Sequence, residues 1–339
     1  MEKYLIAEFE KHGREPVLCQ MSDKSLICLS LTGGETEPAN DNFVGIARSY
    51  DRGKTWTKIE KLFSHETRGV WCPEVFADCG VPFAALLTYD ADMLYMELNN
   101  FISYTYDNGK TWTDPVSFCG ITGRSTLRRG FILSNGDMFF PSYWQETVGE
   151  TGFTTGNVMV PWNKERKNHG KLFRCGAVIS SDGGKTWQQY GYITLGDENI
   201  WEPNAAELEN GHIIMYGRNN SGYLAISESS DYGRTWTEPR ISDIPNSDTK
   251  VTVLKINGKI YMINNFVAEA KWEGRRNLCI AESTDGYNFK IIANVEDENE
   301  LVFYPHAFAD YEERILYVAY ENMKQHYLKK FSFDELGIE

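Results

Sequence analysis

Short runs of alternating apolar and polar residues recur along the chain, and helical periodicity is nearly absent. Alternation with a period of two is typical of β-strands that bury one face. A polar, glycine-containing segment follows each of the clearest runs, as expected for strands that end in turns. These runs lie at residues 43–47, 101–104, 175–179, 223–226 and 278–281.

The segment after each run carries a recurring phrase, Ser/Thr-x-Asp-x-Gly-x-Thr-Trp. Its aspartate can accept hydrogen bonds from nearby backbone N–H groups, and its glycine can adopt a positive φ. We therefore interpret each copy as a hairpin corner with a structural role, over which the tryptophan folds back. Four intact copies span residues 49–56, 105–112, 180–187 and 229–236, and a degraded copy spans 283–289.

This phrase is the Asp-box, and the chain resembles the sialidase-like BNR-repeat superfamily over nearly its whole length. The resemblance implies an all-β fold, a six-bladed β-propeller with Asp-box turns, formed by a single domain over residues 1–339. The 339 residues give about 55 residues per blade, within the range of propeller repeats. The last blade lacks the phrase, and we expect residues 315–320, 327–331 and an amino-terminal strand at 4–9 to close the ring.

Composition narrows the range of partners. The net charge is −14, which argues against nucleic acid and anionic membranes, although a local arginine cluster can still bind a small anion. The seven cysteines are expected to be reduced core residues. Charges interrupt the first apolar run, so we expect no signal peptide and a cytoplasmic protein. No sequence feature demands a metal or an organic cofactor.

Three arginines match the family's carboxylate-binding triad. Arg14 resembles the arginine of its Arg-x-Pro motif, although Gly13 and Glu15 differ from the usual neighbours. Arg218 and Arg276, or the adjacent Arg275, fall where the second and third arginines occur. Guanidinium groups suit this task because each stays charged and presents a planar fork of donors. Taken singly, each could equally be a surface charge.

The resemblance also implies catalytic residues. Tyr304 falls at the family's nucleophile, Glu202 at the base that assists it, and Glu321 at the glutamate that braces the first arginine. Pro305 stands where a serine is usual, and Tyr304 could instead be a packing aromatic. For the acid/base we favour Asp41 in the loop before the first Asp-box. Glu35 and Glu37 are rivals, and each of the three could be a solvated loop charge.

Further residues are candidates for lining a sugar pocket. The segment at 125–145 resembles the family's strand pair that ends at the pocket, although it could instead be a plain blade corner. Its candidate residues are Arg128, Arg129, Tyr143 and Trp144. Glu74 is a weaker candidate, and for His306 we favour a structural role over that of a base. The irregular stretch at 145–168 is either a lid or a surface excursion.

Three functions fit these observations. The leading hypothesis is a retaining exo-α-sialidase-like glycoside hydrolase that releases a terminal carboxylated sugar through a tyrosine nucleophile. The second is a lyase or hydrolase that acts on uronate glycans, where a tyrosine or histidine would abstract a proton. The third is a non-catalytic glycan-binding propeller, because a fold does not fix a function.

Overall fold

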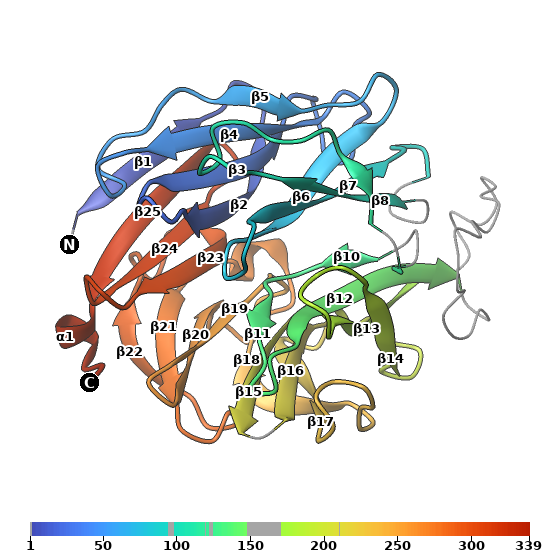
Figure 1. The fold of residues 1–339 in the computed structure, drawn as a ribbon. Helices are drawn as coiled ribbons and strands as arrows, with labels where there is room; N and C mark the ends of the chain where they lie inside the picture. The colour runs from blue at the N-terminus through green and yellow to red at the C-terminus, as the bar shows by residue number, and fades with distance from the viewer. Residues whose placement is uncertain (1, 94–97, 119, 122–124, 148–170, 210) are drawn as a thin grey trace.

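The computed structural model describes residues 2–93, 98–118, 120–121, 125–147, 171–209 and 211–339. These residues form six antiparallel sheets arranged around a central axis (Figure 1). Each sheet is one blade, and its strands follow one another from the axis outward. The first two blades comprise β2 (Gly13–Gln20), β3 (Leu26–Thr32), β4 (Phe43–Ser49) and β5 (Glu60–Phe63), then β6 (Gly69–Phe76), β7 (Phe83–Tyr89), β8 (Leu98–Tyr104) and β9 (Val116–Ser117).

The third blade differs because its innermost strand is interrupted. Two short strands, β10 and β11, both pair with β12, and Arg128 to Gly130 lie between them. The third and fourth blades comprise β10 (Thr126–Leu127), β11 (Phe131–Ile132), β12 (Met138–Thr147), β13 (Lys171–Ser180) and β14 (Gln188–Ile193), then β15 (Trp201–Glu209), β16 (His212–Arg218), β17 (Tyr223–Ser229) and β18 (Arg240–Pro245).

The two ends of the chain meet in the last blade. β1 (Lys3–Glu8) pairs with β25 and so closes the ring, which confirms the predicted role of the amino-terminal strand (Figure 1). The fifth and sixth blades comprise β19 (Thr252–Ile256), β20 (Lys259–Asn265), η2 (Trp272–Gly274), β21 (Leu278–Ser283) and β22 (Lys290–Asn294), then β23 (Phe303–Asp310), β24 (Ile315–Glu321), β25 (Gln325–Ser332) and the short helix α1 (Phe333–Leu336).

The hydrophobic core is divided among the six interfaces between neighbouring blades. One cluster joins the fifth and sixth blades through residues such as Ile263 and Val318. Another joins the first and sixth blades, where Leu26 and Leu328 belong to one cluster. The other four interfaces have clusters of the same kind. Because apolar side chains fill both faces of each sheet, the polar hub residues described below are held on a rigid frame.

The recurring phrase forms the turn between the third and fourth strands of a blade. In the first copy, Asp51 accepts hydrogen bonds from the Thr55 backbone N–H at 2.9 Å and the Thr55 hydroxyl at 2.6 Å. Gly53 adopts a φ of 81°, as predicted, and the indole Nε1 of Trp56 donates to its carbonyl oxygen at 3.2 Å. The other three intact copies repeat these bonds. These bonds all lie within the turn itself.

Two expectations and one further finding concern the rest of the chain. Most of the stretch at 145–168 lies outside the described residues, so its role stays a prediction. The described cysteines are all free. Among the described residues, no helix has the length and apolar character needed to span a bilayer.

Candidate active site

The site lies at the hub, where the innermost strands begin. Three of these strands start with the same local structure: Glu15, Glu202 and Tyr304 each precede a proline and have φ values of 51°, 45° and 51°. The strand pairing shifts register at each of these points, since proline cannot donate a hydrogen bond to the ladder. A left-handed conformation costs a non-glycine residue about 1–3 kcal/mol and commonly marks a functional site.

Tyr304 and Glu202 form a hydrogen-bonded pair at the centre of this hub. The Tyr304 hydroxyl donates to Glu202 Oε1 at 3.1 Å. Burial raises the pKa of Tyr304. Burial also favours the neutral form of Glu202, but Arg218 and Arg128 outweigh it and lower the pKa of Glu202. A neutral phenol therefore faces an ionised carboxylate that can accept its proton.

Three arginines surround Tyr304. Arg218 Nη1 donates to the Tyr304 hydroxyl at 2.9 Å and to Glu202 Oε2 at 2.6 Å. The guanidinium carbons of Arg14 and Arg275 lie 5.0 and 5.5 Å from the centre of the Tyr304 ring. The structure thus brings Arg14, Arg218, Glu202 and Tyr304 together, as the sequence predicted.

The prediction that Arg276 joins this group is contradicted. The Arg276 side chain is 35% exposed and lies 3.8 Å from Glu269 Oε2, whereas its neighbour Arg275 is 7% exposed. The turn η2 ends immediately before Arg275 and directs this side chain inward. The guanidinium carbon of Arg275 lies 4.5 Å from the centre of the Trp272 ring. Arg275, the alternative considered from the sequence, is the third arginine of the hub.

Carboxylates hold the arginines in place. Glu321 is fully buried, and its Oε1 accepts from Arg14 Nε at 3.2 Å and from the Glu15 backbone N–H at 3.0 Å. Glu37 lies 2.8 Å from Arg14 Nη1, and Asp248 accepts from Arg218 Nε at 2.8 Å. Burial opposes the charge on Arg14, but Glu321 and Glu37 more than offset it and raise the pKa of Arg14. Arg14 therefore stays charged inside the hub.

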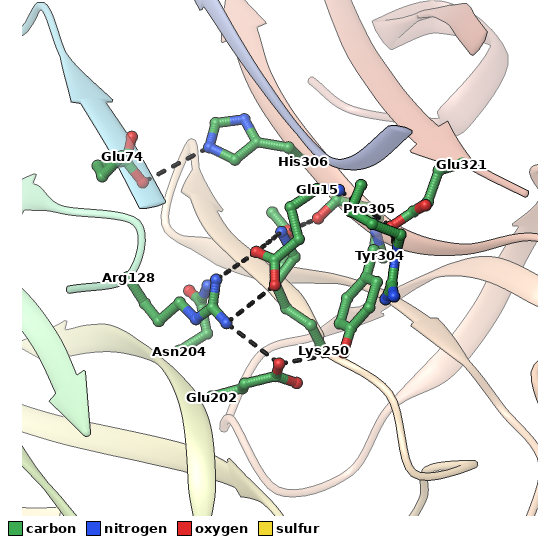
Figure 2. Close-up of polar contacts among 12 residues, drawn as sticks. Glu15, Glu74, Arg128, Glu202, Asn204, Lys250, Tyr304, Pro305, His306 and Glu321 are labelled. Atoms are coloured by element: carbon green, nitrogen blue, oxygen red, sulfur yellow. Dashed lines mark hydrogen bonds and ion pairs between the residues drawn. The ribbon is translucent and has the colours of Figure 1, made fainter. Parts of the chain in front are cut away.

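A second set of charges lies beside the Tyr304–Glu202 pair (Figure 2). Arg128 donates from Nη1 to Glu15 Oε2 at 2.5 Å and from Nη2 to Glu202 Oε1 at 3.1 Å and to the Tyr143 hydroxyl at 3.2 Å. Lys250 Nζ lies 3.5 Å from Glu15 Oε2. Arg128 and Tyr143 thus belong to the hub, as predicted from the sequence.

The acid/base candidates lie in the loop between β3 and β4, beside Arg14. Glu37 of this loop contacts Arg14, and Glu35 pairs with Lys11 at 2.7 Å. Asp41 is exposed, and no hydrogen bond or ion pair joins its carboxylate to a described residue. Of the three carboxylates, only Glu37 contacts a residue of the hub, and these contacts do not select the acid/base.

Trp144 and Arg129 do not join the hub. Trp144 follows Tyr143 on β12 and so points to the opposite face of the sheet, where its ring lies 5.9 Å from that of Tyr192. Arg129 follows Arg128 and turns away in the same manner, donating to the carbonyl oxygens of Ala307 and Val253 at 3.2 and 3.4 Å. The structure therefore brings neither side chain into the hub, and a contact of either one with a sugar stays a prediction.

Glu74 and His306 form a separate pair away from Tyr304 (Figure 2). His306 Nδ1 accepts the Leu18 backbone N–H at 3.2 Å, so the proton of the neutral ring lies on Nε2, 3.5 Å from Glu74 Oε2. Burial lowers the pKa of His306, although Glu74 partly opposes this effect. These contacts favour the structural role for His306 and place Glu74 outside the hub.

That pair lines a cavity of about 690 Å³ at the opposite end of the channel. Its walls come from the later residues of the innermost strands, including Gln20, Glu207 and Ala307. Arg129 also lines this cavity. The channel therefore has two polar ends, and only one contains Tyr304.

Sequence reasoning missed Glu15 and Lys250 as members of the hub. A signal for Glu15 was present, since Glu15-Pro16, Glu202-Pro203 and Tyr304-Pro305 stand at matching positions of three blades. Lys250 has no such proline and lies just ahead of β19. Only the closed ring shows that it faces Glu15.

The fold and the hub define a class: a six-bladed propeller with Asp-box-type turns and a buried arginine–tyrosine–glutamate cluster. The chain belongs to the BNR repeat-like domain family, whose model matches residues 33–315. It is 25% identical over 280 residues to a sialidase of Bacteroides fragilis, covering 72% of this chain and 47% of the relative. It is 24% identical to a sialidase of Paraclostridium sordellii, covering 67% and 57%. The chain thus spans about half the length of these curated relatives.

Solved structures of similar fold include a Hadza microbial sialidase, Hz136, with a TM-score of 0.74 and 18% identity, covering 95% of this chain and 66% of that one. A protein of unknown function from Dyadobacter fermentans has a TM-score of 0.71 and 16% identity, covering 97% of both chains. Trypanosoma rangeli sialidase in complex with 2,3-difluorosialic acid, described as a covalent intermediate, has a TM-score of 0.66 and 17% identity, covering 96% and 55%. At these identities the likeness concerns the fold.

Proposed function

We propose that this protein is a retaining glycoside hydrolase of the exo-α-sialidase type, acting on a terminal sugar that carries a carboxylate. The observation that carries the proposal is the Tyr304–Glu202 pair, joined at 3.1 Å and surrounded by three guanidinium groups. The sialidases among its relatives favour the same activity.

In this mechanism Arg14, Arg218 and Arg275 bind the substrate carboxylate through charge-assisted hydrogen bonds. Tyr304 attacks the anomeric carbon as the glycosidic bond breaks, Glu202 takes the phenolic proton, and the acid/base carboxylate protonates the departing oxygen. A neutral tyrosine suits this role because a carboxylate nucleophile would be repelled by the carboxylate of the sugar; sialidases are a known exception to the rule of two catalytic carboxylates. Water then hydrolyses the glycosyl–tyrosine intermediate, and the Tyr304 oxygen recovers its proton from Glu202.

We assign the acid/base role to Asp41. A general acid has to reach the leaving group, and Asp41 is the exposed carboxylate of the loop between β3 and β4 that forms no ion pair with a described residue. Its rivals are engaged, Glu37 by Arg14 and Glu35 by Lys11. The contacts of His306 give no support to the alternative in which a histidine abstracts a proton from a uronate, because its acceptor nitrogen, Nδ1, already accepts the Leu18 N–H.

The test is turnover of an aryl α-sialoside, followed by proton NMR to identify the first anomer released. We expect hydrolysis with retained configuration, and loss of roughly 10³-fold or more in kcat for Tyr304→Phe. The matched control is Tyr317→Phe, which removes a buried hydroxyl that has no hydrogen-bond partner among the described residues. An inverted product, an unsaturated product absorbing in the near ultraviolet, or full activity of Tyr304→Phe would contradict the proposal.

A further inference from the structure

One guanidinium group serves two carboxylates in the hub. Arg128 contacts both oxygens of Glu15, at 2.5 and 3.3 Å, and also Glu202 Oε1 at 3.1 Å. The side chains of Arg128, Glu15 and Glu202 are 2%, 3% and 7% exposed. Charges interact strongly where water is excluded. The hold of Arg128 on Glu202 therefore depends on how far Glu15 already compensates the arginine charge.

Lys250 extends this dependence. It is 4% exposed, its Nζ lies 3.5 Å from Glu15 Oε2, and it lies 5.5 Å from the centre of the Tyr304 ring. Glu15 is the carboxylate with which Lys250 forms its ion pair. Without the negative charge of Glu15, the positive charges of Arg128 and Lys250 would be uncompensated, and both would stabilise the ionised form of Glu202.

We propose that Glu15 is a positioning residue that keeps Glu202 basic enough to accept the proton of Tyr304. The inference rests on the function proposed above. The negative charge of Glu15 repels the negative charge of Glu202. It also compensates the positive charges of Arg128 and Lys250. Both effects favour proton uptake by Glu202. The charged and titratable groups that contact Glu202 or its partners are Arg128, Arg218, Tyr304, Tyr143, Glu15, Lys250, Asp248, Arg14 and Arg275.

Glu15 is suited to this role because it stays ionised. Burial by itself would raise the pKa of Glu15, but Arg128 and Lys250 overcome that effect and lower it to about 2. Glu15 therefore carries its charge at any pH at which the enzyme would work.

The experiment compares Glu15→Gln, which keeps the shape and removes the charge, with Glu15→Asp, which keeps the charge. For Glu15→Gln we expect the acidic limb of kcat/KM to move to lower pH by roughly one unit and the plateau of kcat to fall about tenfold. The KM for an aryl α-sialoside should stay constant or decrease, because the hub becomes more positive. Glu15→Asp should recover much of the rate.

Lys250→Met is the opposing variant, because it removes a cation beside Glu15 and should move the acidic limb to higher pH. A shift of both variants in the same direction would overturn the inference. So would a Glu15→Gln variant that loses rate with an unmoved pH profile, since this is the behaviour of a purely structural residue.

Wild-type enzyme that hydrolyses no sialoside would refute the proposed function instead. The inference is then tested by thermal unfolding of Glu15→Gln, Glu202→Gln and the double variant. Because both carboxylates share Arg128, the Tm change of the double variant should differ from the sum of the single changes. Additive changes would show that the two carboxylates are independent, and the inference would be wrong.

Discussion

Glu15 in the hub and Asp51 in the first Asp-box turn both have a pKa of about 2, although their surroundings are opposite. Glu15 is 2% exposed, and the ion pairs with Arg128 and Lys250 overcome the effect of burial on its pKa. Asp51 lies on a partly exposed turn, where the hydroxyl and backbone N–H of Thr55 lower the pKa of its carboxyl. The low pKa arises in Glu15 from charged residues that are far away in the sequence, and in Asp51 from hydrogen bonds to a residue nearby in the sequence.

The difference lies in what each carboxylate requires of the fold. The hydrogen bonds of Asp51 reach at most four residues along the chain, so they stabilise the turn whatever the rest of the molecule does. The contacts of Glu15 with Arg128 and Lys250 span 113 and 235 residues, so they exist only in the closed ring. Buried ion pairs add little stability, so the ion pairs of the hub are better explained by a functional role. The hydrogen bonds of the turns are explained by a structural role.

The largest effect on stability is expected from breaking the hub at Arg128. Arg128→Met leaves Glu15 and Glu202 without their shared cation in a buried position. Breaking a buried pair on one side costs about 3–5 kcal/mol, and we expect a loss of this size in the free energy of unfolding measured by urea denaturation. A loss below about 1 kcal/mol would mean that water reaches these carboxylates.

Removing the third arginine should affect activity more than stability. Arg275→Ala should lower kcat/KM for a carboxylated aryl glycoside roughly 100-fold, because a charge-assisted hydrogen bond contributes about 1.5–3 kcal/mol. Arg276→Ala is the matched control, and its kcat/KM should stay within about twofold of wild type because Arg276 is half-exposed and directed at Glu269. Equal losses in the two variants would contradict the assignment of Arg275.

Breaking a turn should have a smaller effect. Asp51→Ala removes the acceptor of two Thr55 bonds at a site that solvent screens. We expect a loss of at most about 1 kcal/mol in the free energy of unfolding and an unchanged KM. A change in KM would show that turn and hub are coupled, which the separation of their hydrogen bonds does not predict.

The pH dependence of stability should show the smallest difference. Both carboxylates have pKa values of about 2 in the folded protein, below their usual 4.5 for Glu15 and 3.8 for Asp51. Their contributions are therefore fully present above about pH 4–5 and are lost as the pH falls toward 2. In Tm measurements across this range, Glu15→Gln and Asp51→Asn should each be less sensitive to acid than wild type; a steeper acid response would contradict the sign.

Local patterns predicted the fold, and long-range contacts determine the rest. The Asp-box turns and the strand that closes the ring were predictable because a hairpin corner and a period of two are encoded within a few residues. Tyr304, Glu202, Arg14 and Arg218 were found through family motifs. Family motifs did not decide between Arg275 and Arg276, because a shift of one residue along the chain reverses the direction of the side chain.

Two other outcomes have different physical causes. The opposite directions of Tyr143 and Trp144 follow from strand alternation, and this rule could have removed Trp144 beforehand. The pairing of Lys250 with Glu15 depends on the closure of six blades, and no local pattern contains it. The structural role favoured for His306 agrees with its contacts, but no local pattern contains its backbone partner, the Leu18 N–H, which lies 288 residues away.

Covalent trapping on Tyr304 tests the central claim most directly. With 2,3-difluorosialic acid, fluoride leaves C2 as the glycosyl–enzyme bond forms and the fluorine at C3 slows hydrolysis, so the adduct can be located by mass spectrometry of peptides. We expect a single adduct on the peptide that contains Tyr304, and none in Tyr304→Phe. Turnover of a sialoside by wild-type protein that leaves Tyr304 unmodified, or an adduct on another residue, would contradict the account.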